Sequence, residues 1–90
     1  MPVSSLAPLP LPPEKWNQLG QALRLSPQQK RIVELILRNR CDKQIAADMG
    51  LGHSTLRTYI TRIFHRTGVS DRVELILLVF ALSHDIRPHK

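Results

Sequence analysis

The sequence is poor in cysteine, and its histidines are scattered. The single cysteine, Cys41, cannot form an internal disulfide, and the four histidines lack the spacing of a Cys/His metal site. These facts favour a metal-free, cytoplasmic protein. The first eleven residues lack a charged leader, and prolines break their apolar run, so they predict neither a signal peptide nor a membrane span.

The motifs of common enzyme classes are also missing. No G-x-S-x-G elbow occurs. The sequence Gly50-Leu51-Gly52 lacks the third glycine of a dinucleotide-binding loop, because Thr55 stands there, and it lacks the Gly-Lys pair of a phosphate loop. Ninety residues with only seven acids also leave little room for a substrate pocket. We therefore expect no catalysis, no cofactor and no small-molecule ligand.

Acids are scarce enough to leave the chain strongly basic. Thirteen Lys and Arg against seven Asp and Glu give a formal net charge of +6. This balance favours a polyanion or an acidic membrane surface as partner. Residues 51–69 contain no acid at all but include Arg57, Arg62 and Arg66. The excess charge is thus concentrated in one segment.

That segment carries a helical pattern over residues 53–67. Leu56, Ile60 and Ile63 recur at the spacing of one buried stripe, with Phe64 beside them. Arginine can bind a phosphate or a guanine edge with two parallel hydrogen bonds, and hydroxyls accept either kind of contact. A solvated amphipathic helix would have the same pattern, so the neighbouring segments decide. The polar face comprises Ser54, Thr55, Arg57, Thr58, Thr61, Arg62 and His65.

The N-terminal region differs in composition from the rest. Five prolines among residues 1–13 rule out a helix or a central strand there and favour a flexible arm. A short accessory helix follows, with Trp16, Leu19 and Leu23 on one side. We therefore divide the chain into a Pro-rich arm (1–13), an accessory helix extending to Arg24 (14–24), a helical domain (25–86) and a tail (87–90).

Two further helices precede the basic one. Ser26 and Gln29 form a capping box around Pro27, which predicts a helix from there to residue 38 or 39. Residues 41–50 predict a short helix that ends at a left-handed Gly50. A short helix, a tight turn and a longer basic helix together make a helix-turn-helix.

The last predicted helix is apolar nearly all round. Asp71 and Glu74 form a capping box after Ser70, and every residue from 75 to 82 is apolar. A small bundle covers only one side of such a helix, so the other side predicts contact with a second copy. The expected core side holds Leu75, Ile76, Val79 and Leu82, and the expected dimer side holds Leu77, Leu78 and Ala81.

Residues 25–82 resemble the LuxR-type (GerE-like) helix-turn-helix domain of bacterial transcription regulators. The matching strings are L-S-P, K-Q-I-A-A-D-M-G-L, S-T-L-R-T-Y-I and I-F-H-R-T-G-V-S-D-R-V-E-L. The usual family pattern reads approximately N-K-E-I-A, then T-V-K-x-H, then K-L-G-V-x-x-R-x-E. Tyr59 stands at the family's histidine, and Thr67 stands at its leucine.

The resemblance implies roles for individual residues. Arg57, Thr58 and Thr61 would contact base edges in the major groove, and the final helix would form a homodimer on an inverted-repeat site. The residues expected at the DNA backbone are Lys43, Gln44, Ser54, Thr55, Tyr59, Arg62 and Arg66.

The sequence therefore predicts an all-α bundle of four to five helices that regulates transcription by binding duplex DNA. The alternative is a basic helical module that dimerises or binds proteins without recognising DNA. That alternative explains the apolar last helix but leaves the acid-free segment unexplained. A membrane surface is the weaker expectation, because the basic helix is needed to close the bundle.

Overall fold

The computed structural model describes residues 7–85, which form five α-helices and no strand. The all-α prediction is confirmed. The tail (87–90) and the first six residues of the expected arm lie outside the described residues. In chain order the helices are α1 (Pro13–Ala22), α2 (Pro27–Leu37), α3 (Asp42–Met49), α4 (His53–Thr67) and α5 (Arg72–Asp85).

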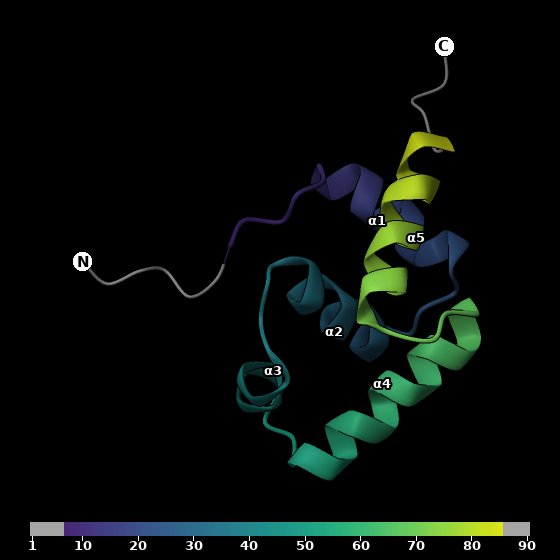
Figure 1. The fold of residues 1–90 in the computed structure, drawn as a ribbon. Coiled ribbons are helices and arrows are strands. Elements are labelled where there is room, and N and C mark those ends of the chain that lie inside the picture. The colour runs from purple at the N-terminus through teal and green to yellow at the C-terminus, as the bar shows by residue number, and fades with distance from the viewer. Residues whose placement is uncertain (1–6, 86–90) are drawn as a thin grey trace.

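The core is built around α2, which contacts α3, α4 and α5 (Figure 1). Apolar residues of α2 are buried on more than one side of the helix: Ile32, Val33 and Leu35 are each at most 1% exposed. A helix buried on so much of its surface can hold several others in fixed positions. Leu19 of α1, Ile45 of α3, Leu56 and Ile63 of α4, and Leu75 and Val79 of α5 complete the core.

The predicted starts of α2 and α5 are both capped. The N–H of Gln29 donates to Ser26 Oγ at 3.1 Å, and Gln29 Oε1 accepts from the N–H of Ser26 at 3.0 Å, so this capping box is confirmed. At α5, Asp71 Oδ1 accepts from the N–H of Glu74 at 2.8 Å. The Glu74 carboxylate accepts instead from Ser70, at 2.7 Å. The Asp71 half of the predicted box is therefore present, whereas the Glu74 side chain binds the N–H of Ser70 instead of that of Asp71.

Each of the first four helices is followed, within two residues of its end, by a residue with a left-handed backbone. α1 ends at Ala22 rather than Arg24, because Arg24 has a φ of 57° and the next N–H, on Leu25, donates to Gly20 O at 3.0 Å. α2 likewise ends at Leu37, before a left-handed Asn39. These are helix-terminating hydrogen bonds of the Schellman type. The four left-handed residues are Arg24, Asn39, Gly50 and Gly68.

Residues 7–12, which belong to the expected Pro-rich arm, lie against the domain. Leu11 is 9% exposed, and Leu9 packs on the core. The N–H of Ala7 donates to Arg38 O at 3.2 Å. The leucines between the prolines therefore add apolar contacts to the core.

The accessory helix α1 packs on α5 and against the start of α2. Trp16 and Leu19 are buried as predicted, whereas Leu23 is only half-buried. Gly20, rather than Leu23, is the third buried residue of α1. The Lys30 side chain packs against Gly20. A Cβ at Gly20 would lie 3.0 Å from Lys30 Cδ.

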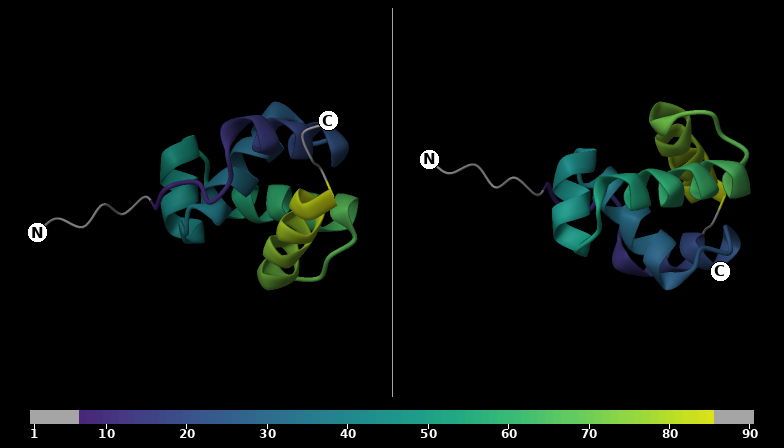
Figure 2. Two further views of the ribbon diagram at one scale, coloured as in Figure 1. Left: turned by 90° about the horizontal axis from the view of Figure 1, so that it is seen from above. Right: turned by 90° about the horizontal axis from the view of Figure 1, so that it is seen from below.

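α4 lies at the edge of the bundle. In the view from below in Figure 2, α4 runs in front of the other helices, from α3 at one end toward α5 at the other. One long side of α4 therefore faces away from the core.

Candidate nucleic-acid interface

The turn between α3 and α4 is fixed by backbone hydrogen bonds. The N–H of Leu51 donates to Ala46 O at 2.9 Å, and the N–H of Gly50 donates to Ala47 O at 3.2 Å. Gly50 permits this because its φ is +67°, which is unfavourable for residues with a Cβ. Figure 1 shows α3 end-on and α4 from the side. This is the predicted helix-turn-helix.

α4 has one buried face and one exposed face. Leu56 and Ile63 are fully buried, and Tyr59, Ile60 and Phe64 are half-buried against the core. The polar side chains face outward as the periodicity predicts. The exposed residues are His53, Ser54, Thr55, Arg57, Thr58, Thr61, Arg62, His65 and Arg66.

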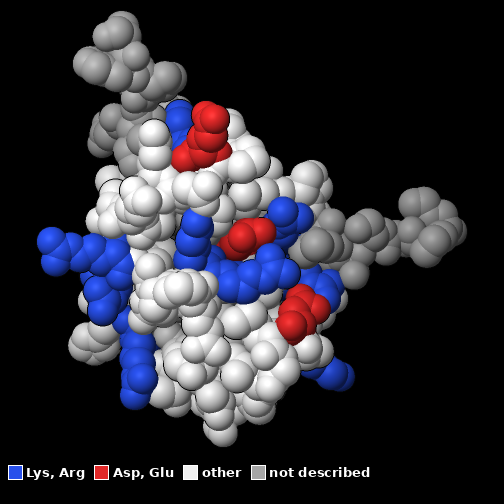
Figure 3. All heavy atoms as spheres, turned by 180° about the vertical axis from the view of Figure 1, so that it is seen from behind, with Lys and Arg blue, Asp and Glu red and all other residues white. Residues whose placement is uncertain are grey.

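The arginines of this exposed face make no hydrogen bond or ion pair with any residue from 7 to 85. Figure 3 shows the back of the molecule, where red carboxylate groups lie beside blue ones, while blue groups at the left edge have no red neighbour. An unpaired guanidinium keeps its five N–H donors for a partner. The exposed arginines of α4 without a partner among residues 7–85 are Arg57, Arg62 and Arg66.

The hydroxyl groups on α4 are partly used within the helix. Thr58 Oγ1 donates to Ser54 O at 3.1 Å. The Thr58 oxygen can therefore still accept a hydrogen bond, and its methyl group can pack against a partner. On the other side of α4, Thr67 Oγ1 donates to Ile63 O at 2.8 Å, which satisfies the hydroxyl at a position where the family pattern has leucine.

The residues expected at the DNA backbone have different surroundings. Lys43 is exposed at the start of α3. Gln44 is half-buried, and its Oε1 accepts from the N–H of Cys41 at 2.9 Å, so it caps α3. Sequence reasoning missed this cap, although Gln44 stands three residues after Cys41, as Gln29 does after Ser26. Tyr59 packs on the core with part of its ring, unlike the exposed Thr55.

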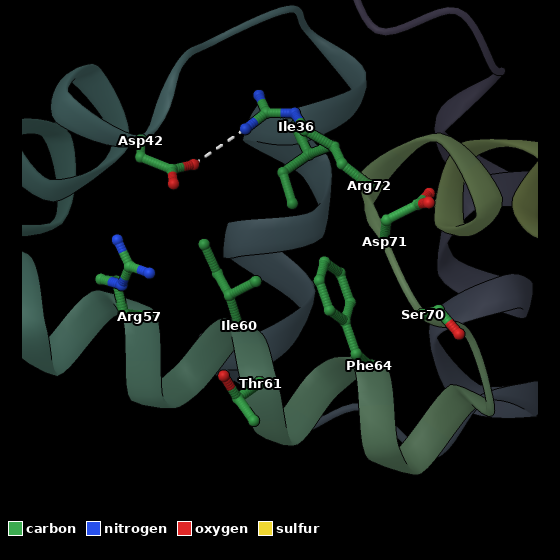
Figure 4. A pocket seen from close by; sticks show the side chains of 9 residues that line it. All are labelled: Ile36, Asp42, Arg57, Ile60, Thr61, Phe64, Ser70, Asp71 and Arg72. Carbon is green, nitrogen blue, oxygen red and sulfur yellow. Dashed lines mark hydrogen bonds and ion pairs between the residues drawn. The ribbon is translucent and has the colours of Figure 1, made fainter.

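Arg57 borders a hollow of about 280 Å³ between α3, α4 and the start of α5 (Figure 4). Arg72 Nη1 donates to Asp42 Oδ1 at 2.8 Å, and Arg72 Nη2 donates to Arg40 O. Arg72 therefore ties α5 to the start of α3, a role that sequence reasoning did not assign. The hollow is lined by Ile36, Asp42, Arg57, Ile60, Thr61, Phe64, Ser70, Asp71 and Arg72.

A second ion pair braces α3. Arg40 Nε and Nη2 donate to Asp48 Oδ2 and Oδ1, each at 2.8 Å. These hydrogen bonds, helped by the charge of Arg40, hold the pKa of Asp48 below its ordinary value. Because Arg40 precedes α3 and Asp48 lies near its end, the pair links the turn before α3 to the last turn of the helix.

No group of three or more His, Cys, Asp or Glu side chains within residues 7–85 is arranged to hold a metal ion. Cys41, an exposed thiol at the start of α3, belongs to no such group. Among the same residues, no helix is long and apolar enough to cross a membrane.

α5 has an exposed apolar face. Leu77 is 62% exposed and Ala81 is exposed, as expected for the predicted dimer side, whereas Leu78 is half-buried. Val73 is 64% exposed and extends the same face by one turn. Sequence reasoning missed Val73 because it precedes the continuous apolar run. We define the α5 stripe as Val73, Leu77 and Ala81.

Comparison with known proteins gives consistent matches. A family model described as "Bacterial regulatory proteins, luxR family" matches residues 23–79. The chain is 30% identical over 64 residues to "Response regulator Rre1" of Synechocystis sp. (strain ATCC 27184 / PCC 6803 / Kazusa), covering 71% of this chain and 27% of that protein. It is 27% identical over 60 residues to "Probable transcriptional regulator ycf29" of Pyropia yezoensis, covering 67% and 27%. The chain thus spans about a quarter of the length of these relatives. No solved structure matches it significantly.

Proposed function

The chain belongs to the LuxR family of bacterial regulatory proteins, and we propose that it regulates transcription by placing α4 in the major groove of duplex DNA. The printed names of its two relatives, a response regulator and a probable transcriptional regulator, support this proposal. The expectation that the domain is not an enzyme is confirmed by its membership of this family.

The observation that carries the proposal is the exposed face of α4. It is acid-free, its three arginines are unpaired within the described residues, and the core holds it in place through Leu56 and Ile63. An α-helix fits the major groove, and arginine and threonine can both contact base edges there. A face with cations in excess also attracts the phosphate backbone.

We assign different tasks to different parts of this face. Arg57, Thr58 and Thr61 contact bases. The surrounding residues position the helix by contacting phosphates, which carries little sequence information. These backbone residues are Lys43, Gln44, Ser54, Thr55, Tyr59, Arg62 and Arg66.

The α5 stripe provides the contact for a second copy. Its three residues lie at i, i+4 and i+8, so they form one apolar strip on the outside of α5. Two copies of a chain of net charge +6 repel each other. The uncharged α5 stripe lets two copies come into contact without bringing like charges face to face. A two-fold dimer would present two α4 helices to successive major grooves, about 34 Å apart, and would favour an inverted repeat.

The test of DNA recognition begins with selection of bound duplexes from a random pool. Binding to the selected site should weaken steeply with salt, with a log–log slope of about −0.9 per phosphate contacted. Arg57→Ala should cost about 1–3 kcal/mol on the preferred site and relax preference at one base position. Arg62→Ala should weaken all sequences similarly. No binding at about 50 mM salt would favour the alternative of a protein-interaction module.

The test of dimerisation is Leu77→Glu, which places charge in the α5 stripe. We expect a folded monomer that binds DNA more weakly and without cooperativity. Ala22→Glu, at an exposed site on α1, is the control for added charge and should stay dimeric. Sedimentation equilibrium and DNA titration provide the readouts. A Leu77→Glu protein that remains dimeric would place the interface elsewhere.

A further inference from the structure

Arg57 faces a carboxylate in the absence of DNA. In Figure 4 its guanidinium rises from α4 toward Asp42, across the hollow between α3 and α4. One Asp42 oxygen accepts from Arg72 at 2.8 Å, and the other is turned toward α4. The residue that we assign to base recognition therefore has an acid of its own protein in front of it.

Asp42 is the acid that Arg57 faces within this hollow. The other acidic residue of the lining, Asp71, caps α5 through its Oδ1 and points away from Arg57 in Figure 4. Arg72 is already held by Asp42 and by Arg40 O. Among the residues that line the hollow, Arg57 is thus the cation on the α4 side of Asp42.

The carboxylate is also a feature of this chain. In the family pattern N-K-E-I-A, the corresponding residue is asparagine, and here the sequence is D-K-Q-I-A. An asparagine Oδ1 could accept the hydrogen bond from Arg72 equally well. A neutral residue would suffice for the hydrogen bond, whereas the carboxylate adds a charge that acts on Arg72, on the start of α3 and on Arg57 alike.

We propose that Asp42 is a positioning residue, which keeps Arg57 directed over the hollow until a base edge replaces Asp42 as the partner of Arg57. This inference rests on the proposed function of Arg57. The two side chains face each other without a hydrogen bond or ion pair, so their attraction acts over a longer distance and is weak. Arg57 can therefore turn away when a guanine edge offers two hydrogen bonds. On a duplex without that base, Arg57 stays turned toward Asp42. Asp42 therefore reduces affinity for the preferred site and affects other duplexes less.

The test is a double-mutant cycle with Asp42→Asn and Arg57→Ala. Equilibrium dissociation constants are measured for the selected site and for an unrelated duplex of the same length, at one salt concentration. We expect Asp42→Asn to tighten binding to the selected site by about two- to fivefold more than binding to the unrelated duplex. In the Arg57→Ala background this difference should disappear.

Asp71→Asn is the matched control, because it removes the same charge from the other side of the hollow and asparagine caps a helix as well as aspartate does. It should change binding to both duplexes equally. An equal gain on both duplexes with Asp42→Asn, or a gain that persists without Arg57, would overturn the role of Asp42. If Arg57→Ala instead leaves base preference intact, the assignment of Arg57 fails, which is a different outcome.

A measurement without DNA gives an independent answer. The Arg57 Nε–Hε resonance of the free protein should shift on Asp42→Asn, while that of Arg62 stays in place. This readout does not depend on the bound sequence. Identical Arg57 resonances in the two folded proteins would mean that Asp42 does not hold Arg57.

Discussion

Apart from Arg24, the arginines that the structure describes fall into two groups with different surroundings. Arg31, Arg38, Arg40 and Arg72 each pair with a carboxylate at 2.8–3.2 Å. The arginines of α4 pair with no described residue, although they lie on the longest of the five described helices. The same side chain thus braces α2, α3 and the contact between α3 and α5 in one region, and is exposed without a partner among the described residues in the other.

This contrast shows where charge serves the fold. Arg40 and Arg72 both act on α3, one by pairing with Asp48 and the other by pairing with Asp42. They hold the first helix of the helix-turn-helix at both of its ends. The α4 arginines contribute nothing comparable to the packing, and unpaired like charges on one helix repel one another. Their arrangement makes physical sense when an anion covers them.

The largest expected effect is a loss of DNA affinity when an acid is introduced on the exposed face of α4, so that an arginine there gains a carboxylate partner. Thr61→Glu puts an acid one helical turn from Arg57, where it can pair with Arg57 and repel phosphates. We expect DNA affinity to fall at least about thirtyfold, from the lost contact and from repulsion together, with little change in thermal stability. Fluorescence anisotropy with a labelled duplex measures the loss.

Thr61→Val is the matched control, because it removes the hydroxyl but adds no charge. It should weaken binding to the preferred site only severalfold. If Thr61→Glu binds DNA as tightly as Thr61→Val, the α4 face is not the surface that contacts DNA.

The two groups of arginines also differ in how well the sequence predicts them. The exposed face of α4 follows from local periodicity, since Leu56 and Ile63 fix which side is buried. The same reasoning placed all five helices and the left-handed Gly50. The ion pair of Arg72 with Asp42 joins residues 30 apart in the chain, and periodicity carries no information on such a contact.

The remaining differences have local causes that residue preferences do not reveal. Arg24 and Asn39 follow the ends of α1 and α2 in left-handed conformations that backbone hydrogen bonds stabilise. Glycine is the usual residue in this conformation, so its absence at these two positions left the exact helix ends unpredicted. Val73 precedes the continuous apolar run that marked the predicted dimer side, and its exposure is decided by how α5 is rotated against α2 and α1. Rotation of a helix that is apolar on all sides is set by tertiary packing.

A smaller effect should separate the two groups by stability. Arg72→Met keeps most of the side-chain length but removes the hydrogen bonds to Asp42 and Arg40 O. We expect a loss of about 1–2 kcal/mol in the free energy of unfolding, measured with urea. Arg62→Met should change it by less than about 0.5 kcal/mol. Equal losses would mean that pairing in the structure does not distinguish the two groups.

The smallest expected effect concerns pH and the Arg40–Asp48 pair. Because Arg40 lowers the pKa of Asp48 in the folded state, the pair stabilises the fold fully above the unfolded pKa of about 3.9. The stabilisation is lost as pH falls through the lower, folded pKa, because the unfolded state takes up the proton at a higher pH than the folded state does. Thermal unfolding of the wild type and Asp48→Asn should therefore differ by a constant amount between about pH 5 and 7, and the two should converge in acid.

Arg40→Met provides the decisive background for this measurement. Without the guanidinium, Asp48 should titrate near its unfolded value, and adding Asp48→Asn should then leave the acid dependence of unfolding unchanged. Arg62→Met, which removes an arginine that has no carboxylate partner among residues 7–85, should keep the full effect of the Asp48→Asn substitution. A pH dependence that survives Arg40→Met would assign the low pKa of Asp48 to another cause, such as the charge of Arg31.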